Sequence, residues 1–90
     1  MKIIFSQHAI QQMFKRSIYV EQVKHAIMHG EEINFYPEDK PYPSKLLLVI
    51  ENEIPLHVVI AENSEHDEII VVTTYIPEKD IWNDTYKSKR

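Results

Sequence analysis

The chain of 90 residues contains no cysteine, only one glycine and no long apolar run. Without cysteine it can form neither a disulfide nor a thiolate metal site. Its apolar runs fall far short of the ~18 residues that a membrane helix needs. The apolar start, Met1–Phe5, is too short for a signal peptide, so we expect a cytoplasmic protein with no membrane partner.

The length and composition indicate one small globular domain, residues 1–90. Hydrophobic residues make up 43% and charged residues 27% of the chain, which is ordinary for a soluble protein. A core of this size must stabilise the fold alone or share that role with a partner. The formal net charge of −4 counts against strong non-specific binding to nucleic acid, although it leaves room for a local basic site.

Two short helices are expected near the start of the chain, after a β-rich run over Lys2–Phe5. Ser6 is a suitable N-cap, and apolar residues at helical spacing then predict a helix over residues 7 to 16. A second apolar stripe begins at Val20 and ends at Gly30, the expected C-cap. The residues expected to pack the two helices on a sheet are Ile10, Met13, Phe14, Val23 and Ile27.

After Gly30 the hydrophobic period changes from that of a helix to that of a strand. Strands are expected around residues 33–35, over 45–51, at 56–60 and over 68–76, with turns at 52–53 and 63–67. The predicted fold is therefore α+β, with two N-terminal helices packed on an antiparallel sheet of about four strands. Trp82 should pack a short terminal helix or a turn back onto this sheet.

Residues 36 to 45 form a stiff loop that precedes a buried strand. Three of the five prolines and two of the five tyrosines lie in this segment. Proline excludes a helix here and restricts the residue before it, so the loop is extended. Such a loop is a plausible wall for a binding site, or it merely closes an edge of the core.

Two of the five histidines, His25 and His29, stand four residues apart on the second predicted helix. This spacing lets two imidazoles share a metal ion. No third ligand is spaced to join them, and they lie off the apolar stripe of the helix. We therefore expect both to be exposed to solvent, with no metal and no other cofactor bound.

Four other residues are candidates for acid–base or phosphate chemistry. His8 lies in the first turn of a helix, where the macrodipole favours the neutral imidazole that a general base requires. His57 interrupts an apolar strand, and Tyr75 lies near the end of the last strand. Arg16 ends the first helix two turns beyond His8. Each also has a structural interpretation: a satisfied core group for the histidines and the tyrosine, and a partner of the C-terminal helix dipole for Arg16.

Four segments in order resemble a known bacterial family: FSQHAIQQMFKRSI, YPEDKPYPSKLLL, IPLHVVIA and IIVVTTYIP, followed by Trp82 and a basic tail. Together they cover nearly the whole chain, which resembles the domain of unknown function 4258 family. The residues of the family's first motif that this chain keeps are Ser6, His8, Ala9, Met13 and Arg16. It has Gln12 where an arginine is usual and Ser17 where a glycine is usual.

The resemblance implies a RelE-like fold, grouped with RelE-like and barnase-like ribonucleases and toxins. It further implies a toxin-like, metal-independent endoribonuclease of a bacterial toxin–antitoxin pair, with RNA as substrate and a cognate antitoxin protein as partner. Metal-independent cleavage of RNA needs a base for the 2′-hydroxyl, an acid for the 5′-oxygen and cations on the phosphate. The residues that would carry these catalytic roles are His8, Arg16, His57 and Tyr75, with Tyr42 and Lys45 binding the substrate.

On this hypothesis the four catalytic side chains converge on one cleft beside the loop from Tyr42 to Lys45. The alternative is a non-catalytic protein-binding module, or a homodimer formed through its β-rich edge, with the same fold. The net charge and Gln12 favour the alternative, whereas the catalytic set favours the ribonuclease.

Overall fold

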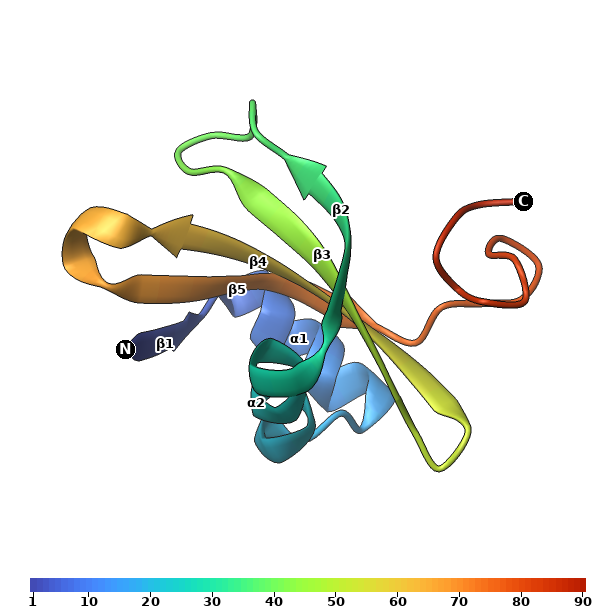
Figure 1. Ribbon diagram of the computed structural model, residues 1–90. Helices are drawn as coiled ribbons and strands as arrows, with labels where there is room; N and C mark the ends of the chain where they lie inside the picture. The colour runs from blue at the N-terminus through green and yellow to red at the C-terminus, as the bar shows by residue number, and fades with distance from the viewer.

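The computed structural model describes all 90 residues as two helices on one face of a five-stranded mixed sheet (Figure 1). Along the chain the elements are β1 (Lys2–Phe5), α1 (Gln7–Arg16), α2 (Val20–His29), β2 (Glu31–Tyr36), β3 (Ser44–Glu51), β4 (Ile54–Asn63) and β5 (Glu68–Tyr75). A single 3₁₀ turn, Ser64–His66, joins β4 to β5. In space the strands follow the order β1-β5-β4-β3-β2.

The predicted α+β class and the two helices are confirmed, but the predicted sheet was wrong in two respects. The sheet has five strands, and β1 runs parallel to β5 while the other neighbours are antiparallel. The helices also follow a strand and do not begin the fold. The pairing of β1 with β5 joins the two ends of the sequence: the amide of Ser6 donates to the carbonyl of Val71 at 3.0 Å. A contact between segments so far apart has no local signal in the sequence.

The ends of α1 follow from its capping residues. The hydroxyl of Ser6 accepts a hydrogen bond from the amide of Ala9 at 3.0 Å, as an N-cap should. The helix ends at Ser17, which has φ 55° and ψ 41°, the left-handed conformation in which glycine is favoured. Ser17 stands where the family pattern has glycine, and its left-handed backbone conformation is one that suits glycine.

The core lies between the two helices and the sheet, but α1 is turned differently from the expectation. Met13 is buried, whereas Ile10 is 55% and Phe14 is 90% exposed, so the predicted packing of those two residues was wrong. Successive helical residues are about 100° apart, and here the line from Ala9 to Met13 faces the sheet. On α2 the expectation holds. The hydrophobic core comprises Ala9, Met13, Ile18, Val23, Ala26, Leu47, Leu56, Val58, Ile60 and Val71, with Ile27 packed against it.

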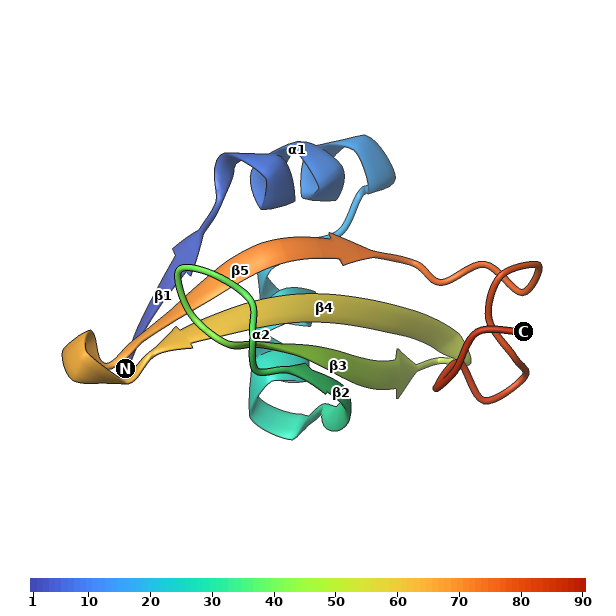
Figure 2. The same ribbon diagram turned by 90° about the horizontal axis from the view of Figure 1, so that it is seen from above.

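The second face of the sheet carries no helix, and we call it the helix-free face. Alternation along β4 turns Val58 toward the helices and His57 away from them, with Leu48 and Tyr75 as the cross-strand neighbours of His57. Residues 77–90 leave the end of β5 and fold back on themselves, closed by a bridge between Trp82 and Lys89 (Figures 1 and 2). The helices are too short and too polar for any of them to cross a membrane.

Candidate functional site

The centre of the helix-free face is His57, a titratable side chain with no exposed surface. Its Nδ1 lies 3.2 Å from the hydroxyl oxygen of Tyr75, and its Nε2 lies 2.8 Å from the carbonyl oxygen of Tyr86. The indole of Trp82 meets the imidazole edge to face, with ring centroids 4.4 Å apart and an interplanar angle of 89°. Trp82 and Tyr86 thus bring the C-terminal segment over His57, and the expectation that Trp82 packs a terminal turn on the sheet is confirmed.

The hydrogen bonds of His57 define its tautomer. A backbone carbonyl can only accept, so Nε2 carries the hydrogen and donates it to Tyr86. In the neutral ring Nδ1 is then an acceptor, and the hydroxyl of Tyr75 donates to it. Both ring nitrogens are occupied, and the phenol of Tyr75 is the half-buried member of the pair.

Burial sets the charge state of both members. Desolvation lowers the pKa of His57 below its usual value, and the hydrogen bond to the Tyr86 carbonyl opposes that shift only in part. Desolvation also raises the pKa of Tyr75, with a smaller contribution from the nearby phenol of Tyr36. At neutral pH the pair is therefore a neutral imidazole and a neutral phenol, joined by one hydrogen bond. Such a pair can move a proton between a bound group and the imidazole.

We expect the folding stability to decrease as the pH falls below about 6.5, the ordinary pKa of histidine. The unfolded chain binds a proton at this residue there, whereas the folded chain, with its lowered pKa, does not. An NMR titration of the His57 ring should accordingly give a midpoint below 6.5. Trp82→Ala, which opens the ring to water, should move that midpoint upward. A wild-type midpoint at or above 6.5 would contradict the buried geometry.

The proline-rich loop lies over another part of the helix-free face. Tyr42 accepts a hydrogen bond from the side-chain amide of Asn63 at 3.1 Å, and the buried hydroxyl of Ser44 donates to the carboxylate of Asp39. Beneath the loop is a cavity of about 260 Å³, lined in part by Tyr42 and Lys40. These bonds fix the loop on the sheet, so Tyr42 is presented on a rigid support.

The structure does not bring the predicted catalytic residues into one cleft. His57 and Tyr75 meet on the helix-free face, whereas His8 and Arg16 are exposed on α1, which packs on the other face. Arg16 makes one hydrogen bond, from its Nε to the side chain of Gln12 at 3.2 Å. Sequence spacing places His8 and Arg16 on one helix, but it gives no information about which face of the sheet that helix covers.

Lys45, expected to bind substrate, is also away from the His57–Tyr75 pair. It follows the alternation of β3 onto the face of Leu47, which the helices cover. Its ammonium group lies 2.7 Å from a carboxylate oxygen of Glu62 and 3.4 Å from one of Glu32. The hydrogen bond to Glu62 raises the pKa of Lys45. Lys45 is thus held by two carboxylates, and we assign it no contact with phosphate.

His25 and His29 are both exposed, as expected. Their ring centroids are 4.9 Å apart, and His25 Nε2 lies 3.7 Å from a carboxylate oxygen of Glu51. No group of three or more histidine, aspartate or glutamate side chains is arranged so that it could hold a metal ion, here or elsewhere in the structure.

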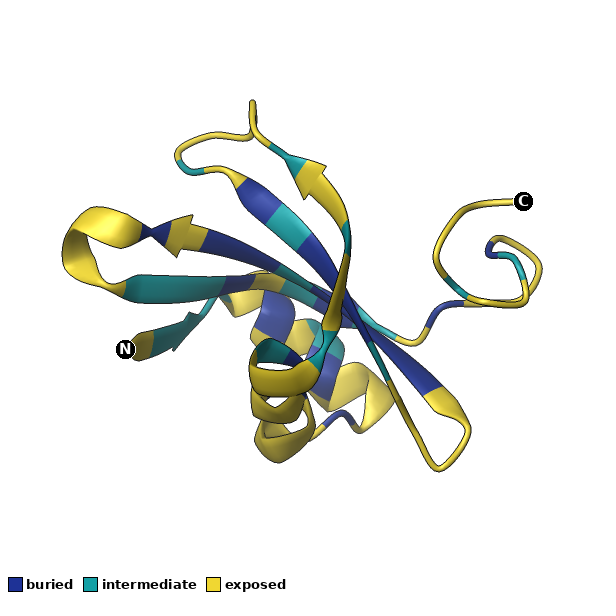
Figure 3. Ribbon diagram, in the orientation of Figure 1, coloured by how far each residue is buried: buried dark blue, intermediate teal, exposed yellow.

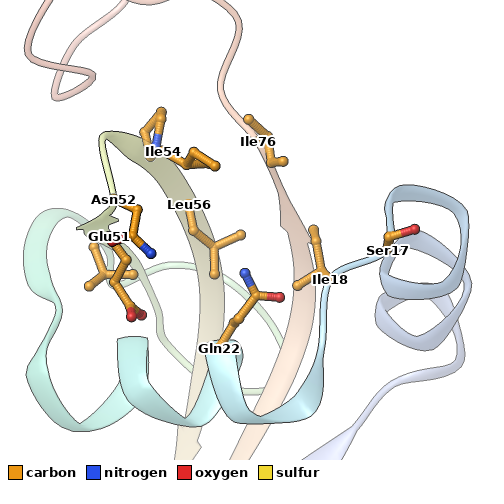
Figure 4. A pocket seen from close by; sticks show the side chains of 10 residues that line it. Ser17, Ile18, Gln22, Glu51, Asn52, Ile54, Leu56 and Ile76 are labelled. Atoms are coloured by element: carbon orange, nitrogen blue, oxygen red, sulfur yellow. The ribbon is translucent and has the colours of Figure 1, made fainter.

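A separate cleft of about 370 Å³ opens at one end of the core, where the α1–α2 turn faces the β3–β4 hairpin (Figure 4). Gln22 rises from α2 into the space between Ile18 and Leu56, and Glu51 and Asn52 border it on the hairpin side. Neither His57 nor Tyr75 lines this cleft. It combines an apolar floor with a few amide and carboxylate groups, and it contains no pair able to transfer a proton in the way His57 and Tyr75 can.

Sequence reasoning missed three residues of the site. Tyr36 was noted only as part of a stiff loop, Trp82 only as a packing residue, and Tyr86 not at all. Tyr86 takes part through its backbone, which has φ 62°, and a main-chain contact leaves no signal in residue type. The clustering of aromatic residues near both the loop and the C-terminus was the one usable hint.

The fold and the site define a class of protein: a small α+β domain with a helix pair on one face of a mixed sheet and a buried His–Tyr pair on the other. The family model described as Domain of unknown function (DUF4258) matches residues 5–76, and the chain belongs to this family. No curated protein and no solved structure gives a significant match. The matched region contains His57 and Tyr75, while the segment with Trp82 and Tyr86 follows it.

Proposed function

We propose that the chain is a toxin-like, metal-independent endoribonuclease of a bacterial toxin–antitoxin pair, with a RelE-like fold and a cytoplasmic location. The observation that carries the proposal is the hydrogen bond from the Tyr75 hydroxyl to Nδ1 of a neutral, buried His57. A phenol that is accessible on one side and bonded to an acceptor on the other can relay a proton. This is the first requirement of metal-independent RNA cleavage.

The proposed step begins with the 2′-hydroxyl of a ribose placed against the oxygen of Tyr75. As the 2′-oxygen attacks the adjacent phosphorus, its proton passes to the Tyr75 oxygen, and the proton of Tyr75 passes to Nδ1 of His57. The resulting imidazolium is stabilised by its Nε2–H bond to the Tyr86 carbonyl. The P–O5′ bond breaks as the P–O2′ bond forms, which leaves a 2′,3′-cyclic phosphate, and the departing 5′-oxygen takes a proton from solvent water. Loss of the proton from Nδ1 through the Tyr75 oxygen to water then restores the neutral pair.

Substrate binding would use the aromatic residues of the helix-free face. Tyr42 and Tyr36 offer rings on which unpaired bases can stack. Arg16 and Lys45 do not lie at this site, so contacts to phosphate fall to the loop and the C-terminal segment. Lys40 lines the cavity under the loop, and Lys89 lies over the ring of Trp82, 5.9 Å from its centroid. The proposed catalytic set is thus Tyr75 with His57, without His8 or Arg16.

The proposal predicts that Tyr75→Phe lowers the rate of RNA cleavage at least about 100-fold, the usual loss when a proton-transfer group is removed. The measurement uses a fluorogenic RNA of mixed sequence, with EDTA present to exclude metal-dependent contaminants. Tyr19→Phe, an exposed tyrosine on the helix side, is the matched control and should keep the wild-type rate. His8→Ala should also keep it.

Two results would overturn the proposal. One is a Tyr75→Phe variant as active as the wild type. The other is a wild-type protein that cleaves no RNA and does not inhibit growth when its expression is induced. The second result would favour the alternative, a non-catalytic protein-binding or dimerisation module. That alternative is supported by the net charge of −4 and by the exposure of Phe14.

A further inference from the structure

Phe14 is the least buried large apolar side chain of the molecule, with 90% of its surface exposed. It borders a groove of about 380 Å³ between α1, the start of α2 and the end of β1, which we call the α1 groove. The residues that line it are all hydrophobic: Phe5, Ile10, Met13, Phe14, Ile18, Tyr19 and Val20. Most of α1 is coloured as exposed in Figure 3, and its buried residues are Ala9 and Met13. Contiguous apolar surface of this kind on a small protein marks a site of interaction.

The α1 groove lies in a positively charged part of the chain. Residues 1–20 contain Lys2, Lys15 and Arg16 but no aspartate or glutamate, although the chain has 14 acidic residues. The other 70 residues carry all 14 acids with the remaining seven cations, so their formal charge is −7. No ion pair involves Lys15, Arg16 or Lys24 in the fold. These cations are available to a partner.

The backbone around the α1 groove restricts the shape of that partner. Its walls are α1, the α1–α2 turn, the start of α2 and Phe5 at the end of β1. The amide of Ile18 is bonded to the carbonyl of Met13, and the amide of Tyr19 to the side chain of Gln22. The only strand residue in the lining is Phe5, the last residue of the edge strand β1, so an incoming strand would find no ladder of several donors and acceptors within the groove. A partner that satisfies its own backbone, as a helix does, fits the groove better.

We propose that the α1 groove binds an acidic amphipathic helix of a partner protein. Its apolar side chains occupy the groove against Phe14 and Ile10, and its carboxylates face Lys15, Arg16 and Lys24. A second copy of this chain fits less well, because a symmetric contact through the groove would bring the same cations together. The inference concerns the protein partner and not the cleavage of RNA, so it stands or falls independently of the ribonuclease.

The test measures binding of a labelled synthetic helix to the full chain by fluorescence anisotropy. The probe is a peptide of about five helical turns with leucine at i, i+3, i+4 and i+7 spacing and glutamate on the other face. A matched peptide has lysine in place of every glutamate. We expect the acidic peptide to bind at least about tenfold more tightly, because its carboxylates attract the cations at the rim of the groove and the lysine peptide is repelled by them.

Phe14→Ser should weaken binding of the acidic peptide about tenfold or more, because it removes the central apolar contact. The matched control is Phe35→Ser, which replaces a 47% exposed aromatic on β2, outside the groove. Its affinity should equal that of the wild type. Neither change touches the core, and equal melting temperatures would verify this. Tyr75→Phe should bind the peptide normally, which separates this proposal from the nuclease.

Three outcomes would overturn the inference. The two peptides could bind equally, which would remove the role of charge. Phe14→Ser could bind as well as Phe35→Ser, which would place the contact elsewhere. Sedimentation could instead show a wild-type dimer that Phe14→Ser dissociates, which would assign the groove to a second copy of the chain.

Discussion

Replacement of His57 by alanine should lower the free energy of unfolding by about 3 kcal/mol or more. The change leaves a cavity in a fully buried position, and truncation of a large buried ring typically costs about 3 kcal/mol. It also leaves the Tyr75 hydroxyl and the Tyr86 carbonyl without their partner. In a domain of this size each kcal/mol shifts the melting temperature by roughly 4–8 °C, so the expected decrease exceeds about 12 °C.

The measurement is denaturant unfolding at pH 7, with His66→Ala as the control. His66 is exposed in the turn between β4 and β5, so its replacement should change the unfolding free energy by less than about 0.5 kcal/mol. A loss below about 1 kcal/mol at His57 would show that the C-terminal segment does not depend on this residue. Since His57→Ala disturbs the fold, Tyr75→Phe is the better probe of activity.

Gly30→Ala should destabilise the fold by about 2 kcal/mol, a typical result of forcing an extra carbon into a packed site. A Cβ at Gly30 would collide with the carbonyl oxygen of Ala26 and lie 3.2 Å from that of Leu48. Both are backbone atoms, so neither can rotate away. Replacement of glycine by alanine at a compatible φ usually stabilises by about 0.4–1 kcal/mol, and φ is −68° here. The collision is the larger effect and decides the sign.

Thermal unfolding of Gly30→Ala beside Met28→Ala tests this reasoning. Met28 is 64% exposed in the last turn of α2, so its truncation removes little packing. A stabilised Gly30→Ala would mean that the α2–β2 junction can move away from β3. In that case the glycine would serve only to end the helix.

The two candidate surfaces lie on opposite sides of the sheet. Tyr75, Tyr36 and the proline-rich loop belong to the helix-free face, whereas Phe14 and Ile10 are exposed on α1, in the helix layer. An RNA and a protein helix could therefore bind at the same time without competing for the same side chains. Inhibition by a partner at the α1 groove would have to act through the sheet and not by covering Tyr75.

Local signals predicted the helices closely. α1 spans the predicted residues 7 to 16, because Ser6 caps its start and the apolar spacing runs to its last turn. α2 ends before Gly30, as expected, although Gly30 has φ −68° and not the left-handed conformation. The position requires glycine because the Ala26 and Leu48 carbonyls approach it closely. Capping and periodicity depend on residues within one or two turns, and such information is present in the sequence.

Predictions of which side of a helix faces the core, and of which face of the sheet a helix covers, were less successful. Ile10 and Phe14 share the helical period with Met13, yet only Met13 faces the core. A mixed apolar face is wider than the strip that a small sheet can cover, and sequence alone does not say which part remains exposed. The same limit applied to His8 and Arg16, which were rightly placed on a helix but wrongly expected beside His57.

The sequence by itself determined the α+β class, the two helices, the exposure of His25 and His29, and membership of the family. Only the tertiary structure decided that β1 lies parallel to β5, that His57 donates to the backbone of Tyr86, and that His57 meets Tyr75 apart from His8. The first group depends on residue types at short spacings. The second group of features depends on contacts between residues far apart in the sequence and on which face of the sheet each segment covers. Both are set by the packing of the whole core.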